Sequence, residues 1–214
     1  MSFQITILSD SDSWINAYIP ELVRELEKEG HRVIIVHNVD EISRGDFVFY
    51  LGCGQIVPDS ILKRNRHNLV VHESDLPKGK GWSPLTWQIL KGKNEVPVCL
   101  LEAVEPVDSG KIYLRYTMKF NGTELVGELR KAQADTSIRM CLRFVREYPV
   151  IADKSVKQDG ESTFYRRRSK EDSRLDLDKT IREQFNLLRV VDNEKYPAFI
   201  EFLGNRYIVK IEKA

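Results

Sequence analysis

Residues 68–112 read NLVVHESDLPKGKGWSPLTWQILKGKNEVPVCLLEAVEPVDSGKI, and this stretch decides the fold. The apolar run Asn68–Val71 predicts a short buried strand, and His72–Pro77 ends that strand in a turn. A basic, glycine-rich loop follows at Lys78–Ser83. It leads into a predicted helix at Pro84–Lys91, because proline is tolerated in the first turn of a helix, where its missing N–H costs little.

The second half of the stretch predicts another strand and a loop that holds a carboxylate. Val96–Ala103 is apolar and predicts the strand, and the loop Val104–Gly110 contains Asp108. In a parallel α/β sheet, groups placed just past the carboxyl ends of strands share one crevice. His72 and Asp108 each follow a predicted strand, so we expect these two side chains to meet.

The residues before this stretch predict the rest of an open α/β sheet. Apolar runs at Gln4–Ser9, Arg32–His37 and Asp46–Leu51 predict three strands, with a helix between the first two that ends near Gly30. Parallel pairing is the default for such buried runs. No glycine-rich dinucleotide fingerprint follows the first strand, so NAD is not expected. A short helix is expected at Asp59–Arg66.

The composition changes near Asp153, where a polar and charged segment begins. After the preceding long helix, which we expect to break near Asp135-Thr136, a helix is predicted at Lys179–Val191. A hairpin across Gly204-Asn205 follows it. We therefore expect a catalytic domain at residues 1–152 and a C-terminal extension, a helix plus a β-hairpin, at residues 153–214.

Composition narrows the class of protein. The chain has 214 residues and a net charge of +1, which suits a globular protein and argues against a nucleic-acid scaffold. No apolar run is long enough to cross a bilayer, so a cytoplasmic protein without membrane contact is expected. Three scattered cysteines predict neither a disulfide framework nor a zinc site, and no metal is expected.

Four short motifs occur in order within the deciding stretch. They are His72-Glu73-Ser74-Asp75-Leu76-Pro77, Lys80-Gly81, Pro84-Leu85-Thr86-Trp87 and the loop Asp108-Ser109-Gly110-Lys111-Ile112. This order closely resembles the formyltransferase family that uses 10-formyltetrahydrofolate. The resemblance implies a Rossmann-like formyltransferase core with a mostly parallel sheet. It implies 10-formyltetrahydrofolate as cosubstrate.

The resemblance makes His72 and Asp108 the expected catalytic residues. An imidazole can take up a proton near neutral pH, and a carboxylate can orient it and stabilise its charged form. One position departs from the family pattern, which has Asn two residues before the His where this chain has Val70. Asn68 would lie about 13 Å from His72 along a strand and is not expected to replace it.

The resemblance also implies which residues contact the cosubstrate and the acceptor. Cosubstrate contacts are expected at Gln55, Ile56, Val57, Ser74, Asp75, Leu76, Pro77 and Val104. The first three lie after two glycines, in a segment that would pair with the pterin ring largely through backbone groups, or that simply joins a strand to a helix. Acceptor contacts are expected at Ser9, Asp10, Ser11, Lys78, Lys80, Trp82 and Tyr165.

The C-terminal residues resemble the sugar N-formyltransferase branch of the family. Thr163–Arg168, Asn186–Arg189 and Tyr196–Phe199 carry this similarity. The expected acceptor is therefore the 4-amine of a nucleotide-linked amino-deoxy sugar, with UDP as the nucleotide. The sequence of residues 70–90 most resembles that of the formyltransferases of pseudaminic acid biosynthesis. The terminal hairpin could form a homodimer or pack on its own domain.

Three alternatives remain open at this point. Because the family Asn is absent, the chain could bind a nucleotide sugar or a folate without catalysis. It could instead formylate a different amine, such as glycinamide ribonucleotide, although the arginine-rich tail argues against this. It could also release formate to water as a hydrolase.

Overall fold

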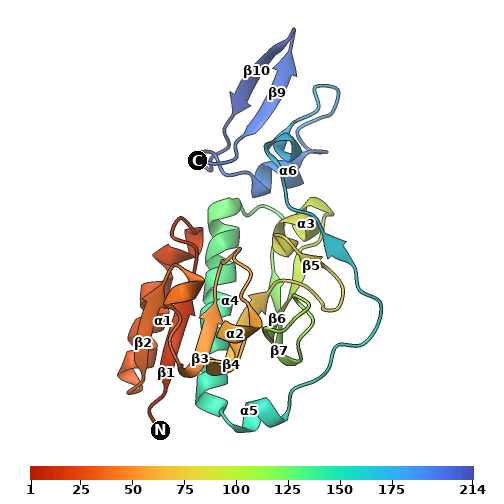
Figure 1. The fold of residues 1–214 in the computed structure, drawn as a ribbon. Coiled ribbons are helices and arrows are strands. Elements are labelled where there is room, and N and C mark those ends of the chain that lie inside the picture. The colour runs from red at the N-terminus through yellow and green to blue at the C-terminus, as the bar shows by residue number, and fades with distance from the viewer.

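A six-stranded sheet forms the centre of the protein, with strand order β2-β1-β3-β4-β6-β7 in a computed structural model that describes residues 1–214 (Figure 1). β1 pairs with β2 and β3 in parallel, and β3 pairs with β4 in parallel. β6 is antiparallel to both β4 and β7. The strands are β1 (Gln4–Leu8), β2 (Arg32–Val36), β3 (Gly45–Tyr50), β4 (Asn65–His72), β6 (Glu95–Glu102) and β7 (Ile112–Lys119).

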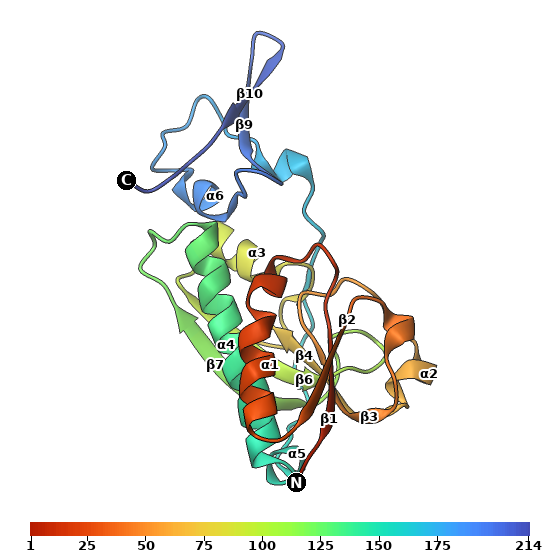
Figure 2. The same ribbon diagram turned by 90° about the vertical axis from the view of Figure 1, so that its left-hand side faces the viewer.

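Helices cover one face of this sheet more fully than the other. α1 and α4 pack side by side on the main face, as Figure 2 shows. The helices are α1 (Ile19–Lys28), α2 (Asp59–Leu62), α3 (Pro84–Leu90), α4 (Val126–Glu147), α5 (Val150–Asp153) and α6 (Phe185–Val190), with 3-10 turns at Trp14–Ala17, Val39–Glu41 and Lys170–Ser173.

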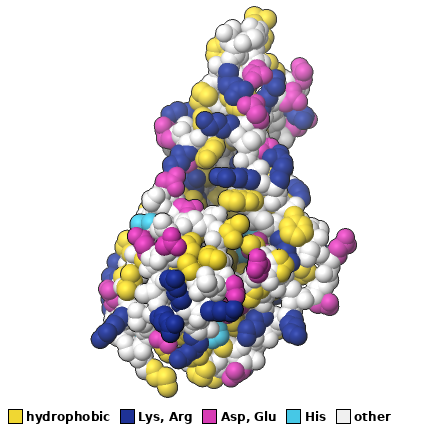
Figure 3. All heavy atoms as spheres, viewed as in Figure 1, with side chains coloured by type: hydrophobic (Ala, Val, Ile, Leu, Met, Phe, Trp, Pro, Cys, Tyr) yellow, Lys and Arg dark blue, Asp and Glu magenta, His cyan; other side chains and the backbone are white.

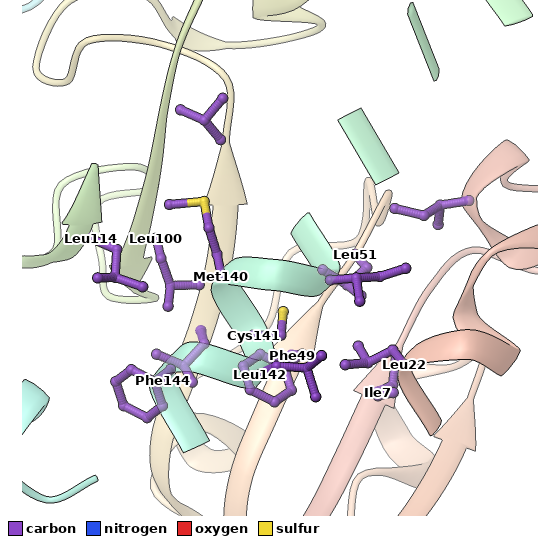
Figure 4. Packing of buried hydrophobic residues seen from close by; sticks show 14 of the residues in the cluster. Ile7, Leu22, Phe49, Leu51, Leu100, Leu114, Met140, Cys141, Leu142 and Phe144 are labelled. Carbon is purple, nitrogen blue, oxygen red and sulfur yellow. The ribbon is translucent and has the colours of Figure 1, made fainter. Parts of the chain in front are cut away.

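The main core lies between the sheet and these two helices. Met140, Cys141 and Phe144 of α4 are fully buried against side chains from the sheet (Figure 4). Leu22 and Leu26 of α1 are fully buried in the same cluster. Burial of such side chains contributes about 1.5–3 kcal/mol each relative to exposure, before entropy is subtracted. This packing holds the strands from which the site is built.

A smaller apolar cluster lies on the opposite face. It contains Leu8, Tyr50 and Ile61, and the half-buried Val57 and Val70 pack against it. Val70 also packs against a third cluster that includes Leu76 and Cys99. This face is covered by loops and short helices, which leaves room for a binding site beside it.

The expected fold class is confirmed, and three expected helices differ in length. α4 runs unbroken through Asp135, because that carboxylate pairs with Lys131 one turn earlier and so supports the helix. α2 ends at Leu62, because the chain enters β4 at Asn65. In the C-terminal extension only Phe185–Val190 is α-helical.

The C-terminal residues form a small unit at the top of the molecule (Figure 1). The chain leaves α5 at the bottom, crosses the body, pairs two residues of β8 (Phe164–Tyr165) with β5 (Lys80–Gly81), and reaches α6. The hairpin β9 (Ala198–Phe202) and β10 (Asn205–Val209) matches the prediction. Phe202, Leu203, Tyr207 and Ile208 are exposed on it. Whether the hairpin forms a homodimer stays a prediction, as does the division at residue 152. The chain contains no helix with both the length and the apolar character needed to span a membrane.

Candidate active site

His72 and Asp108 meet in the structure. His72 is the last residue of β4 and is 5% exposed. Its Nδ1 lies 3.7 Å from Oδ1 of Asp108, and both side chains are nearly buried. Its Nε2 lies 2.9 Å from the carbonyl oxygen of Gly79. The expected pairing of an imidazole and a carboxylate is therefore present.

The reason that the two residues meet differs from the expected one. β6 is antiparallel to β4, with Glu102 opposite Leu69, so its carboxyl end lies away from His72. Ala103 N donates to Asn68 O at 2.7 Å, which places the start of the following loop beside the middle of β4. The loop then turns back along β4 and carries Asp108 to His72. The hairpin loop between β6 and β7 thus brings Asp108 to His72, whereas the sequence predicted that two neighbouring parallel strand ends would bring them together.

Several contacts hold Asp108 in place. Its backbone has φ 56°, in the left-handed region that Asp and Asn tolerate better than most residues. Its Oδ2 accepts a hydrogen bond from Gly81 N at 2.9 Å, and its carbonyl accepts one from Gln158 Nε2 at 2.9 Å. Gly110 closes the loop against β6, where a Cβ atom would overlap the carbonyl oxygen of Glu102.

The two ring nitrogens of His72 have different surroundings. Nε2 lies 2.9 Å from the Gly79 carbonyl oxygen, which can only accept, so this nitrogen carries the proton of that bond. Nδ1 faces the Asp108 carboxylate at 3.7 Å, which is beyond hydrogen-bonding distance. Nδ1 is therefore the ring nitrogen that is left to exchange a hydrogen bond or a proton with a substrate, and the catalytic role expected of His72 stays a prediction.

A second carboxyl group lies next to the pair. Glu73 is buried, and its Oε1 accepts a hydrogen bond from Gln133 Nε2 of α4 at 2.7 Å. Burial raises the pKa of the Glu73 carboxyl, and the His72 ring and the Gln133 amide lower it in part.

The position of the family Asn holds an apolar residue with no hydrogen-bonding group. Val70 packs between two apolar clusters. Asn68 cannot replace the missing amide, because its side chain is bonded to Tyr50 Oη at 2.9 Å and to the Leu62 carbonyl at 2.9 Å. Ser74 Oγ is buried without a partner two residues after His72. Ser74 is therefore a side chain with unused hydrogen-bonding capacity close to His72 in the sequence.

The residues expected to contact the cosubstrate form two groups. Val57 packs on the same apolar cluster as Ala103, next to Val104, so the two loops border one apolar surface on which Ile56 and Val104 are exposed. The Gln55 side chain is already bonded to Asp10, the His37 carbonyl and Val39 N, so only its backbone can contact a ligand. An apolar surface with backbone groups beside it suits a flat ring with polar edges.

The second group surrounds the turn after β4. Leu76 is buried in the third cluster with Cys99, so it supports the turn. Asp75 is exposed and pairs with Arg115 of β7 at 2.6 Å, and the same arginine donates to the Leu76 carbonyl. Pro77 is half-buried at the start of the glycine-rich loop.

The residues expected to contact the acceptor are only partly on the surface. Ser9 is fully buried and donates to Asn16 Oδ1 at 2.6 Å, so it supports the loop and does not line a site. Asp10 accepts hydrogen bonds from Gly54 N and Gln55 Nε2, which joins its loop to the cosubstrate segment. Ser11 is exposed.

Trp82 and its neighbours form a basic and aromatic rim. Trp82 is 42% exposed, its ring edge lies against Gly54, and the guanidinium of Arg167 lies 4.7 Å from its ring centroid. Lys78 is exposed, whereas Lys80 is buried with its Nζ 6.0 Å from the Phe164 ring. Figure 3 shows basic and hydrophobic side chains gathered where the body meets the C-terminal unit.

Tyr165 packs against residues next to this rim. Its ring stacks on Trp87 with a 6.2 Å centroid separation and lies 4.6 Å from Lys91 Nζ. Arg166 is paired with Asp172, and Arg168 donates to the Asp172 carbonyl. Arg167 therefore has the guanidinium of this run that is free to bind an anion. Sequence reasoning did not separate it from its neighbours, because only the fold shows which arginines are paired.

Other surface features lie apart from the pair. A groove of about 490 Å³ lies between β7 and α4, and its lining includes neither His72 nor Asp108. No cluster of three or more His, Cys, Asp or Glu side chains is placed to hold a metal ion.

Known proteins share this fold and part of this sequence. A methionyl-tRNA formyltransferase of Malacoplasma penetrans is 28% identical over 182 residues, which is 82% of this chain and 52% of that protein. The chain thus spans about half the length of that relative. A methionyl-tRNA formyltransferase structure from Clostridium thermocellum aligns with TM-score 0.82 and 21% identity, over 99% of this chain and 93% of that one.

Two further structures show the same fold. A sugar N-formyltransferase from a Shewanella species aligns with TM-score 0.70 and 15% identity, over 99% of this chain and 98% of that one. HypX from Aquifex aeolicus in complex with tetrahydrofolic acid aligns with TM-score 0.75 and 19% identity, over 98% of this chain and 37% of that one. The sequence profile of the formyl transferase family matches residues 8–145. That match covers more than half of the chain and includes both His72 and Asp108, so the protein belongs to the formyl transferase family.

Proposed function

We propose that this protein transfers a formyl group from 10-formyltetrahydrofolate to the amine of a nucleotide-linked amino sugar. The observation that carries the reaction type is the His72–Asp108 pair, held at 3.7 Å by a turn and a loop that both lie within the family match. The exposed apolar side chains of Ile56 and Val104, the latter on the loop that carries Asp108, support contact with a flat folate ring. The HypX relative with tetrahydrofolic acid supports the same class of cosubstrate.

The side chains of the pair divide the chemistry between them. When bound, 10-formyltetrahydrofolate would supply the formyl carbon. His72 can donate a hydrogen bond to the oxygen that gains negative charge when an amine adds to a carbonyl. Asp108 can accept the proton that the amine loses, directly or through water, and that proton is available for the leaving nitrogen. Ser74 Oγ, which is buried and unpartnered near Gly79, is the side chain that we propose as a second donor in place of the family Asn.

Three features support a sugar nucleotide as the acceptor. Trp82 is exposed beside the Asp10 loop, where an aromatic face can stack on a sugar or a base. Arg167 and Lys78 are unpaired cations at the same rim and suit a diphosphate. The Shewanella sugar N-formyltransferase matches the chain over nearly its whole length. In its most specific form, the proposal is that the acceptor is a UDP-linked sugar of the pseudaminic acid series and that its 4-amine is formylated.

Methionyl-tRNA is the second candidate acceptor. Curated relatives and the Clostridium structure bear that name, and their similarity favours it. Binding of tRNA rests on many contacts between cations and phosphates. The net charge of +1 gives little general attraction to a polyanion, which favours the smaller acceptor.

A panel of acceptors tests the proposal. The purified protein is incubated with 10-formyltetrahydrofolate and, in separate reactions, UDP- and dTDP-linked 4-amino sugars, glycinamide ribonucleotide or methionyl-tRNA. Mass spectrometry follows the acceptor, and tetrahydrofolate and formate are measured together. A formylated sugar nucleotide is the expected product.

The other outcomes are distinguishable. Formylated methionyl-tRNA or glycinamide ribonucleotide would overturn the sugar acceptor while keeping the reaction. Free formate without a formylated amine would indicate a hydrolase. Tight binding of a sugar nucleotide without turnover would indicate a binding module. His72→Gln is the control for each positive reaction, because it removes the imidazole ring while keeping a polar side chain.

A further inference from the structure

One segment of the C-terminal extension contacts both the loop that carries Asp108 and the loop that faces His72. This crossing segment, residues 156–165, lies beyond the family match at 8–145 and runs over the body between α5 and the C-terminal unit (Figure 1). Most of its side chains are exposed, so hydrogen bonds and not core packing fix its position. At its first residue it pairs with β7, where Val156 and Ile112 exchange two backbone hydrogen bonds of 2.8 Å.

Gln158 is bonded directly to the Asp108 loop. Its Nε2 donates to the Asp108 carbonyl at 2.9 Å and to the Gly110 carbonyl at 2.8 Å. These two bonds use both hydrogens of the amide nitrogen. A carboxylate or an apolar side chain of the same length could donate to neither carbonyl.

The other end of the segment holds the loop that faces His72. Thr163 Oγ1 accepts from Gly79 N at 2.8 Å, and the Thr163 carbonyl accepts from Lys80 N at 2.9 Å. Gly79 provides the carbonyl that His72 contacts, and Gly81 N binds Asp108 Oδ2. The segment therefore closes a ring of contacts through both members of the pair.

We propose that Gln158 is a positioning residue that sets the distance and orientation of Asp108 relative to His72. The expected effect on the reaction rate rests on the proposed function, whereas the expected effect on the geometry of the pair does not. Because the Asp108 loop turns back along β4 and is exposed at Val104 and Val107, bonds from outside the loop are needed to hold its tip. Gln158 supplies two of them, to the carbonyls of Asp108 and Gly110.

The test replaces Gln158 with Met, which keeps the length and removes both donors. Misplacing a catalytic group by about 1 Å can cost about 100-fold in rate, so we expect kcat to fall about 10- to 100-fold with KM for the acceptor little changed. The matched control is Lys157→Met, at an exposed neighbouring position whose side chain forms no hydrogen bond or ion pair. In an Asp108→Asn background, Gln158→Met should cause little further loss, because the two residues act through one carboxylate.

A second readout does not depend on turnover. In protein labelled with ¹⁵N-histidine, the ring nitrogens of His72 report on its distance from Asp108, and His72→Gln assigns their signals among the four histidines. Gln158→Met should shift these signals, and Lys157→Met should leave them in place. If no acceptor is formylated, this spectrum still tests the positioning role.

Two results would overturn the proposal. Unchanged His72 signals in Gln158→Met would show that the amide does not set the pair, whatever the activity. A full additional loss in the Asp108→Asn background would show that Gln158 acts elsewhere. If Gln158→Met does not fold, Gln158→Asn, which keeps the amide but is too short to reach both carbonyls, is tested by the same two measurements.

Discussion

At the scale of single residues, the environment of His72 determines what the site can do. The ring is buried between a carbonyl and a carboxylate, and neither neighbour can donate a hydrogen bond to it. Nε2 is bonded to the Gly79 carbonyl, whereas Nδ1 faces the Asp108 carboxylate at 3.7 Å without a hydrogen bond. The nitrogen on the Asp108 side is therefore the one left for a substrate.

The role of Asp108 is best tested with Asn, because φ 56° would strain most other residues. Asn keeps the backbone and can still accept from Gly81 N, but it loses the charge. Since positioned acid–base groups contribute about 10²- to 10⁴-fold, we expect Asp108→Asn to lower the formyl-transfer rate within that range. Steady-state kinetics measure this, with thermal unfolding as the control for folding. A rate equal to wild type would remove Asp108 from the chemistry.

Glu73 leads to a prediction about pH. Its pKa is raised by burial, so the stability that it contributes is complete below its ordinary value of about 4.5 and is lost as pH rises towards its folded value. Glu73→Gln keeps the bond from Gln133 and removes the titration. We therefore expect the variant to gain stability relative to wild type as pH rises above about 4.5. Urea unfolding at several pH values measures the difference, and two parallel stability curves would contradict it.

At the scale of elements, the β6–β7 loop depends on one glycine. Glu102 N donates to the Lys111 carbonyl at 2.9 Å and closes the base of the loop. Gly110 lies directly against the Glu102 carbonyl, with no room for a Cβ atom. The loop can turn back towards His72 only if this close approach is kept.

Gly110→Ala should therefore displace the loop. We expect a loss of about 1–3 kcal/mol in unfolding free energy, as for other overpacked positions, and a lower formyl-transfer rate because Asp108 moves with the loop. The matched control is Gly127→Ala in α4, where a Cβ atom would meet nothing within 4 Å. That change should stabilise the protein by roughly 0.5–1 kcal/mol. Equal stabilities for the two variants would show that the loop adapts.

At the scale of the whole molecule, a buried arginine joins the C-terminal unit to the core. Arg189 of α6 is 1% exposed and pairs with Glu124 at 3.0 Å, just before α4. It also donates to Asn94 Oδ1 and Asn186 Oδ1 at 3.0 Å. The resemblance of this region to sugar N-formyltransferases includes Arg189, and the structure shows that its contacts are internal.

Arg189→Met should weaken the contact between the C-terminal unit and the core. Removing one partner of a buried pair leaves an uncompensated charge and costs about 3–5 kcal/mol. We expect that loss in chemical unfolding, together with increased protease cleavage near α6. Arg146→Met is the control, because Arg146 pairs with Glu29 on the surface, where such pairs contribute about 0–1 kcal/mol. Similar effects of both variants would show that Arg189 is not the joining residue.

Local sequence determined the strands, the hairpin and the identity of the pair, because burial patterns and turn residues act over a few positions. The apolar run before His72 predicts a strand by itself, whereas His72 and Asp108 were identified by the order of several short motifs and the family that this order resembles. The length of α4 was not predictable in this way, since Asp135 looked like a break and is instead paired with Lys131.

Only the tertiary structure decided how the pair is brought together. β6 runs antiparallel to β4, so the Asp108 loop must turn back to reach His72, and strand direction is set by packing across the sheet and not by any one segment. The same holds for Gln158 and Arg167, whose roles depend on residues 48 or more positions away. Hydrogen bonds and cation–π contacts between such distant residues form only once the chain has folded, so no local pattern announces them.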